Sequence, residues 1–307
     1  MSKRRLSQQQ TNRINQQHTQ RVQRVRKDKD IDTNNLSAPQ KGLIIAHYGS
    51  QLEVKSIEGE NEGEIWRCHL RSNLEALVTG DEVMWQADNT NKIGVVTALM
   101  PRLSLLTRPD AYHKVKPVAA NISLILIVIA SLPTPSEGLI DRYLVACETV
   151  GIPALLILNK SDLLDDSNRE PLRKMLAEYA ALGYDHLELS CFGDLTELSA
   201  RIADKTVVFV GQSGVGKSSL IAEILQQPLI RTGELSSSSQ QGQHTTTTAR
   251  LYHLDAQPGS VIDSPGIREF PLWPLDPSTL AYGFIEFRPF LQDCKYRNCL
   301  HTIEPGC

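Results

Sequence analysis

The sequence contains no hydrophobic run that is long enough to span a membrane. Its longest apolar stretch, residues 122–130, is interrupted only by Ser123 and is far shorter than the roughly 20 residues that a transmembrane helix needs. The first thirty residues also hold no apolar core of a signal peptide. We therefore expect a cytoplasmic protein that has no membrane partner.

Cysteine is scarce, with six residues in a chain of 307, which is too few for a fold held together by disulfides. Three of the six crowd near the C-terminus in the pattern Cys294-x4-Cys299-x-His301-x5-Cys307. Three thiolates and one imidazole are the donors of a closed, tetrahedral zinc site. Because no fifth ligand and no acid/base pair accompany them, we predict one structural Zn²⁺.

A large excess of one charge is also absent, since the net charge is −3, but the charges are unevenly distributed. Residues 1–37 carry nine Lys or Arg and three acidic residues, a net of +6, so the rest of the chain sums to −9. The same segment has almost no large apolar residues to offset the entropy of ordering it. We predict a basic, disordered tail, which either is a solvated leader or binds a polyanion such as RNA.

The remaining chain divides by pattern into three parts. Residues 38–108 hold short β-type runs separated by turn signals, at 43–46, 65–70, 82–86 and 94–99, which predicts an all-β barrel of the oligonucleotide-binding (OB) type. In residues 109–275, buried-type strands alternate with amphipathic helices, which predicts an α/β domain with a mostly parallel sheet. Residues 276–307 form the zinc-binding module. The strands expected in the α/β domain are 122–130, 154–158, 187–189, 206–210 and 260–262, and the helices are 136–150, 171–182 and 219–225.

A complete phosphate-loop pattern, G-x4-G-K-[ST], runs from Gly211 to Ser218 between an expected strand and an expected helix. Glycines let backbone N–H groups approach phosphates, Lys217 offsets their charge, and Ser218 can ligate Mg²⁺. The predicted nucleotide contacts here are Gly211, Gln212, Ser213, Gly214, Val215, Gly216, Lys217, Ser218 and Ser219.

The base is predicted to be guanine, because Asn159-Lys160-Ser161-Asp162 follows another expected strand of the same domain. The Asp162 carboxylate can accept hydrogen bonds from the ring N–H and the amine of guanine, a pair of donors that adenine lacks. Ser190 and Cys191, after the next strand, stand where a further guanine-contacting loop is expected. We therefore predict guanine contacts from Asn159, Lys160, Asp162, Ser190 and Cys191.

The pattern Asp263-Ser264-Pro265-Gly266 supplies a D-x-x-G, in which Asp263 can hold the Mg²⁺ shell and Gly266 can offer its N–H to the terminal phosphate. Residues 236–248 lack large apolar residues and end in a run of threonines, which indicates either a plain surface loop or a switch loop. Its threonines Thr246 and Thr247 join Ser218 and Asp263 as predicted magnesium ligands.

The usual water-positioning Gln after D-x-x-G is replaced by Ile267, which cannot hydrogen-bond. His244 is our candidate for that role, although it could instead cap the loop or contact RNA. Lys217, His244 and Thr246 are thus the predicted catalytic residues.

These elements occur in an unusual order, because the Asn-Lys-x-Asp motif precedes the phosphate loop. A circular permutation explains this order, since joining the old termini and cutting elsewhere leaves the strand positions unchanged. The chain resembles the circularly permuted ribosome-assembly GTPases of the RsgA family. The resemblance covers about residues 38–307 and rests on NKSD, GQSGVGKSS, GQHTTTTARLYH, DSPGIREF and CKYRNCLHTIEPGC, and on the preceding barrel.

The resemblance implies a GTPase that binds the small ribosomal subunit and its rRNA late in maturation, with the nucleotide controlling association and release. It implies stimulation by the subunit, GTP or GDP with Mg²⁺ as ligands, and a helical segment beyond Cys307, so that the zinc-binding module is truncated at its C-terminal end. We also expect a monomer. The alternatives are a P-loop ATPase or kinase, a pure RNA-binding module, and a nucleotide-dependent RNA-binding protein that does not act on the ribosome.

Overall fold

The computed structural model describes residues 36–49, 51–70, 74–109, 115–226, 249–264, 267, 275–291, 293–296, 299, 301 and 303–307. Residues 1–35 of the predicted basic tail, the whole threonine loop 236–248 and Gly266 lie outside these residues. Within the described residues, no helix is long and apolar enough to cross a membrane.

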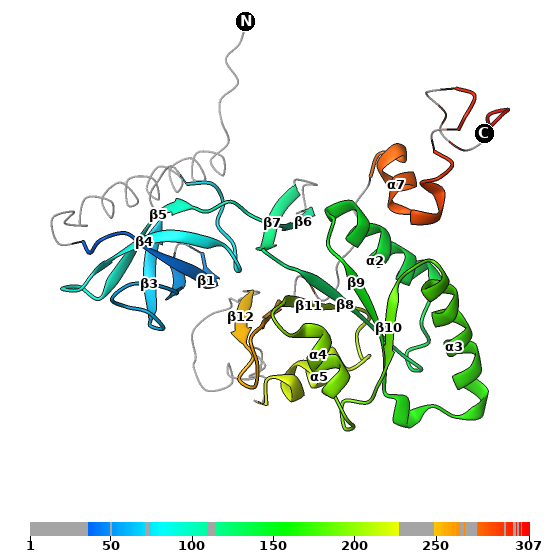
Figure 1. The fold of residues 1–307 in the computed structure, drawn as a ribbon, viewed down its shortest axis with the longest axis horizontal. Coiled ribbons are helices and arrows are strands. Elements are labelled where there is room, and N and C mark those ends of the chain that lie inside the picture. Colours follow the sequence, from blue (N-terminus) through cyan, green and yellow to red (C-terminus); the bar gives the residue numbers. More distant parts are fainter. Residues whose placement is uncertain are drawn as a thin grey trace, which may run out of the picture.

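Five strands close into the expected N-terminal barrel (Figure 1). They are β1 (Gln40–Tyr48), β2 (Gln51–Ser56), β3 (Ile65–Leu70), β4 (Glu82–Asp88) and β5 (Ile93–Leu99). The pairs β1–β2, β2–β3, β4–β5 and β1–β4 are antiparallel, and β3–β5 is parallel. Side chains alternate between the interior and the surface, as in β2, where Leu52 and Val54 are buried. Trp66 and Trp85 pack inside, with ring centroids 5.6 Å apart.

The α/β domain has the mostly parallel sheet that the pattern predicts, in the order β10-β9-β8-β11-β13-β12. Only the last pair in this part of the sheet, β12–β13, is antiparallel. The strands are β8 (Leu124–Ala130), β9 (Ala154–Asn159), β10 (Asp185–Glu188), β11 (Thr206–Val210), β12 (Arg250–His253) and β13 (Ser260–Asp263).

Helices cover both faces of this sheet. The buried sides of α2 (Glu137–Val150) and α3 (Asp166–Ala181) join one core, and those of α4 (Thr196–Ile202) and α5 (Lys217–Ile224) join the other. The central strand β8 is buried at every residue, which explains its continuous apolar sequence.

The structure differs from the predicted elements at several places: α4 and β12 were not predicted, and α5 begins two residues before its predicted start. Two further differences have a clear local cause. Helix α3 begins at Asp166 and not at Pro171, because Asp165 and Asn168 form a reciprocal capping box one turn earlier. Strand β2 was missed altogether, since its outward-facing positions are polar and only its alternate residues are buried.

A hairpin, β6 (Leu105–Pro109) and β7 (Val115–Ala120), leads from the barrel to the α/β domain, and the predicted boundary at 108/109 falls inside it. The two parts also meet where β1 pairs with β12, so that one eleven-stranded sheet runs through both. After β13 the chain reaches α7 (Pro277–Gly283), whose Gly283 lies so close to α2 that a Cβ atom there would be 2.6 Å from Val145 Cγ1. The short helical turns η2 (Ser161–Leu163) and η3 (Ile285–Phe287) complete the described elements.

Candidate functional site

The predicted nucleotide motifs lie at the carboxyl ends of neighbouring parallel strands. Asn159 ends β9, Gly211 follows β11, Asp263 ends β13, and Ser190 lies two residues after β10. Because these strands run parallel, their carboxyl ends share one edge of the sheet, which is where ligands of such sheets bind.

The phosphate loop turns sharply between β11 and α5, and its glycines are required by close approach. Gly211, Gly214 and Gly216 all have positive φ, at 139°, 85° and 97°. A Cβ atom at Gly211 would lie 2.2 Å from the carbonyl oxygen of Val128, and one at Gly216 would lie 2.3 Å from Nδ2 of Asn159. Any larger residue at these positions would therefore push the loop away from its neighbours.

Lys217 opens α5, and its side chain folds back over this loop. Its Nζ donates hydrogen bonds to the carbonyl oxygens of Gly211 (2.6 Å) and Gln212 (2.5 Å). The residue is 7% exposed, so its positive charge is held away from bulk water. A buried cation with carbonyl partners is well placed to bind an anion, and the N-terminus of α5 adds its partial positive charge at the same place.

The Asn159 and Lys160 side chains tie the guanine motif to the phosphate loop. Asn159, which is fully buried, donates from Nδ2 to the carbonyl oxygen of Val215 at 2.9 Å. Lys160 donates from Nζ to the carbonyl oxygens of Gly214 (2.6 Å) and Leu132 (3.3 Å). Side-chain hydrogen bonds thus join the Asn-Lys-x-Asp segment to the phosphate loop.

Asp162 and Cys191 also come together at this edge of the sheet. Asp162 lies in η2, which is joined to the next loop by a hydrogen bond from Ser161 N to the carbonyl oxygen of Leu189 (3.1 Å). Burial, and then the negative charge of Asp162, raises the pKa of the Cys191 thiol. The turn that holds Asp162 is therefore hydrogen-bonded to the residue that leads into the 190–191 loop.

The loop after β8 belongs to this site, although the sequence analysis did not include it. The Leu132 carbonyl accepts from Lys160, and a Cβ at Gly214 would be 3.8 Å from Cδ of Pro133. Its position at the carboxyl end of the central strand was the available signal, because every other loop at that edge carries a motif.

The predicted hydrolytic and Mg²⁺ residues are only partly described. Ser218 is the second residue of α5, next to Lys217, and Asp263 ends β13, where it lies opposite Arg250 of β12. Both provide the oxygen donors that Mg²⁺ prefers. Ile267 is 2% exposed and packs in the apolar core, so it cannot orient a water molecule. His244, Thr246, Thr247 and Gly266 lie outside the described residues, and their roles stay predictions.

The four predicted zinc ligands gather after η3. One donor atom from each of Cys294, Cys299, His301 and Cys307 lies within 4.8 Å of the others. Nδ1 of His301 is 3.4 Å from Sγ of Cys294 and 3.6 Å from Sγ of Cys307. With Zn–S distances of about 2.3 Å, a tetrahedral ion needs donors about this far apart, so the cluster fits zinc.

A protonated thiol does not ligate zinc, so protonation of these cysteines would weaken metal binding. Burial, and then Cys299, raises the pKa of Cys294 to about 11, and Cys299 is also the main cause of the raised pKa of Cys307. Thiols that crowd together resist ionisation unless a cation is shared among them.

Comparison with known proteins agrees with this geometry. A sequence model described as "RsgA GTPase" matches residues 99–273. Proteins named "Small ribosomal subunit biogenesis GTPase RsgA" from Hahella chejuensis and Marinobacter nauticus are 51% and 47% identical to the chain. In both cases the match covers 100% of this chain and 90% of the relative.

Two solved structures share the fold. The YjeQ crystal structure from Thermotoga maritima has a TM-score of 0.69 at 28% sequence identity. The match covers 88% of this chain and 89% of the YjeQ chain. The structure of YloQ, described as a circularly permuted GTPase, has a TM-score of 0.66 at 28% sequence identity. The match covers 88% of this chain and 86% of the YloQ chain.

Proposed function

The chain belongs to the RsgA GTPase family, and from this membership and the geometry of the site we propose that it hydrolyses GTP in the biogenesis of the small ribosomal subunit. The observation that carries the proposal is the direct tie between the two nucleotide motifs. Asn159 and Lys160, which belong to the guanine motif, bond to the carbonyl oxygens of Val215 and Gly214 in the phosphate loop. A nucleotide with a guanine base and a phosphate chain fits across this junction.

We assign the base to Asp162 and the loop of Ser190 and Cys191, and the phosphates to the backbone of residues 211–219 and the Lys217 ammonium. When GTP enters, its phosphate oxygens replace the carbonyl partners of Lys217, so that the cation neutralises charge on the transferred group. Ser218 and Asp263 would hold Mg²⁺, which when bound neutralises phosphate charge. Because Ile267 is buried in the core, the attacking water must be positioned by another group, and we assign this role to His244.

Several finer assignments belong to the same proposal. The barrel of residues 38–108 would be of the OB type and would contact rRNA together with the basic tail 1–37, while residues 109–275 form the GTPase domain. The module of residues 276–307 would hold one structural Zn²⁺. We propose that the protein is a monomer that acts late in subunit maturation, in the cytoplasm, where ribosomes are assembled. The nucleotide state would control association with the subunit and release from it.

GTP hydrolysis measured with and without purified small ribosomal subunits tests this function. We expect slow hydrolysis alone, acceleration by small but not large subunits, and no competition by ATP.

His244→Ala should bind GTP normally and show poor turnover under both conditions. If small subunits neither bind nor stimulate the protein while a nucleotide-dependent affinity for other RNA is found, the alternative of an RNA-binding protein acting away from the ribosome is correct. Competition by ATP would contradict the guanine assignment.

A further inference from the structure

Arg250 lies where the barrel meets the α/β domain. It is the first residue of β12, and in the pairing of β12 with β1 it lies opposite Ala46 of the barrel. In the pairing of β12 with β13 it lies opposite Asp263, the residue that we assign to Mg²⁺. One residue thus neighbours both a barrel strand and a residue of the GTP site.

The Arg250 side chain reaches into the barrel. Its Nη1 donates to the Tyr48 hydroxyl at 2.8 Å and to Oε2 of Glu53 at 2.9 Å, and its guanidinium lies 5.9 Å from the ring centroid of Tyr252. The side chains of Arg250 and Glu53 are 35% and 20% exposed, so the pair is partly shielded from water. A half-buried, charge-assisted hydrogen bond is stronger than a fully exposed one.

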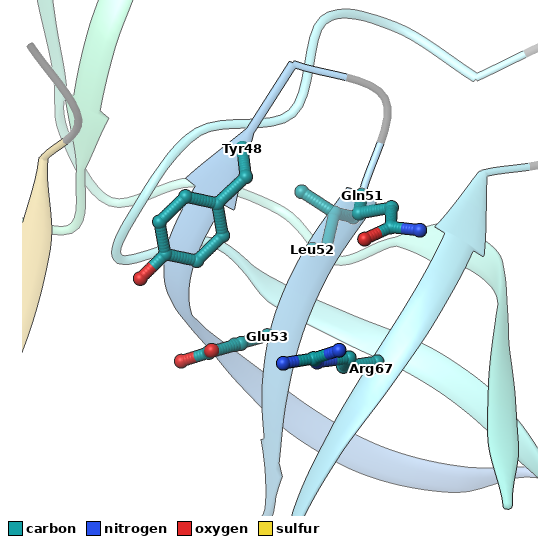
Figure 2. A pocket seen from close by; sticks show the side chains of 5 residues that line it. All are labelled: Tyr48, Gln51, Leu52, Glu53 and Arg67. Carbon is teal, nitrogen blue, oxygen red and sulfur yellow. The ribbon is translucent and has the colours of Figure 1, made fainter. Parts of the chain in front are cut away.

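The partners of Arg250 are accessible from the barrel surface. A pocket of about 290 Å³ is lined by Tyr48, Gln51, Leu52, Glu53 and Arg67. Figure 2 shows the Tyr48 hydroxyl and the Glu53 carboxylate directed to the same side of this pocket, with Arg67 next to Glu53. A macromolecule that binds this face of the barrel therefore lies beside the two groups that hold Arg250.

The backbone alone holds β12 weakly to the barrel. The register of β1 and β12 contains a single pair, Ala46 and Arg250, and the other described bond at this place runs from Thr79 Oγ1 to the Ala249 carbonyl (2.9 Å). The barrel has a separate attachment at the end of β7, where Nδ2 of the following residue, Asn121, donates to the Gly80 carbonyl at 2.8 Å. Breaking the Arg250 contacts would loosen β12 while the barrel stays attached through β7.

We propose that Arg250 is a positioning residue for GTP hydrolysis, because its bond to Glu53 passes a displacement of the barrel to β12 and, through the β12–β13 pairing, to Asp263. The partner that displaces the barrel is the small ribosomal subunit, so this inference rests on the proposed function. The Arg250–Glu53 pair would then contribute to stimulation by the subunit and not to nucleotide binding.

The test is Glu53→Gln in the full chain, which removes one charge and touches no residue of the nucleotide site. We expect KM for GTP and the unstimulated kcat to stay within about twofold, while the kcat with small subunits falls roughly tenfold, an ordinary size for coupling between sites. Loss of an acidic group does not weaken the electrostatic attraction to RNA, and measuring the stimulated kcat at saturating subunit concentration separates it from any change in binding. Asp185→Asn, which breaks the surface pair of Asp185 with Arg201, is the matched control and should keep full stimulation.

A double-mutant cycle separates a shared role from two independent ones. If the pair acts as a unit, Glu53→Gln combined with Arg250→Gln should lower the stimulated kcat no further than Arg250→Gln alone. Full stimulation of Glu53→Gln, or losses that multiply in the double variant, would overturn the proposal.

Hydrogen exchange keeps the two proposals distinguishable. In the unmodified protein, replacing GDP by a non-hydrolysable GTP analogue should change amide exchange in both β12 and β2, and in Glu53→Gln it should change exchange in β12 alone. If subunits fail to stimulate the unmodified protein, the proposed function is wrong, and this exchange pattern still decides the role of the pair. The same exchange in the variant and the unmodified protein would reject that role.

Discussion

The side-chain amide of Asn159 donates a 2.9 Å hydrogen bond to the carbonyl oxygen of Val215, which lies 56 positions later in the chain. It joins the end of β9 to the loop after β11, two strands that are separated in the sheet by β8. The contact shows why the order of the motifs along the chain is unimportant for the site. Parallel strands bring their carboxyl ends to one edge whichever of them comes first.

Asn159→Ala should destabilise the protein as well as its nucleotide complex. The substitution leaves the buried Val215 carbonyl without this donor, at a cost of about 1–3 kcal/mol in the free energy of unfolding. Urea unfolding without nucleotide measures that cost, and titration with a fluorescent GTP analogue should show weaker binding. Asn91→Ala, which breaks a part-buried bond to Asp88 in the barrel, is the control and should leave GTP affinity unchanged. An unaltered unfolding free energy for Asn159→Ala would contradict this account.

Asp162→Asn should change the base preference. An amide in place of the carboxylate cannot accept both donors of guanine but complements the altered edge of xanthine, so affinity should move from GTP to xanthosine triphosphate by roughly tenfold or more. Competition binding with the two nucleotides gives the ratio. Asp166→Asn, in the first turn of α3, removes a nearby carboxylate outside the site and should keep the preference for GTP. A retained preference in Asp162→Asn would remove Asp162 from the base contacts.

Lys217→Ala should weaken the binding of guanine nucleotides, and more so for those with two or three phosphates than for GMP. Its ammonium lies over the phosphate loop, bonded to Gly211 and Gln212, so its loss should lower the affinity for GTP and GDP by roughly tenfold or more. The affinity for GMP, whose single phosphate lies farther from this cation, should change much less. Lys174→Ala, on the exposed side of α3, is the charge-matched control. Equal losses for all three nucleotides would indicate a folding defect in place of a phosphate contact.

Features with a local cause could be predicted from the sequence. Strand β11 has the predicted bounds, since its apolar run is bracketed by polar residues and glycine, and the phosphate loop after it carries its own signature. Contacts through backbone atoms could not be predicted. Every residue has a backbone carbonyl, so the sequence does not indicate that the one at Leu132 accepts from Lys160. The pairing of Arg250 with Glu53 joins positions 197 residues apart, and nothing near either residue indicates the other.

Zinc binding should depend on pH in a defined direction. Because the pKa of Cys294 is raised to about 11 in the metal-free cluster, its thiol is protonated at neutral pH and must lose a proton to bind zinc. Zinc affinity should therefore fall as the pH is lowered, and binding should release protons. Metal analysis after dialysis at pH 8 and pH 5 should give one zinc per chain at the higher pH and less at the lower. A metal content that is independent of pH would contradict thiolate ligation.

The last prediction concerns what the cluster contributes to function. Its described links to the GTPase domain run through α7 and through Arg288, which bonds to Glu148 of α2 (2.5 Å), and not through the phosphate loop. A cavity of about 700 Å³ lies between α2, α7 and the cluster, lined by Glu148, Tyr282 and three of the four ligands, so loss of the metal should disturb mainly this region. The double substitution Cys294→Ser and Cys299→Ser should therefore leave GTP and GDP affinities nearly unchanged in nucleotide titrations.

The same variant should lose part of the difference in subunit affinity between its GTP-analogue and GDP forms. Only residues 267–293 separate the D-x-x-G motif from Cys294. We expect this short segment to pass a displacement of Gly266 on to the zinc module, which requires that the module be rigid. Subunit binding in the two nucleotide states measures the difference, with Cys68→Ser, a buried barrel thiol outside the cluster, as the control. If the nucleotide-dependent difference survives without zinc, the signal passes through the barrel and the Arg250–Glu53 pair instead.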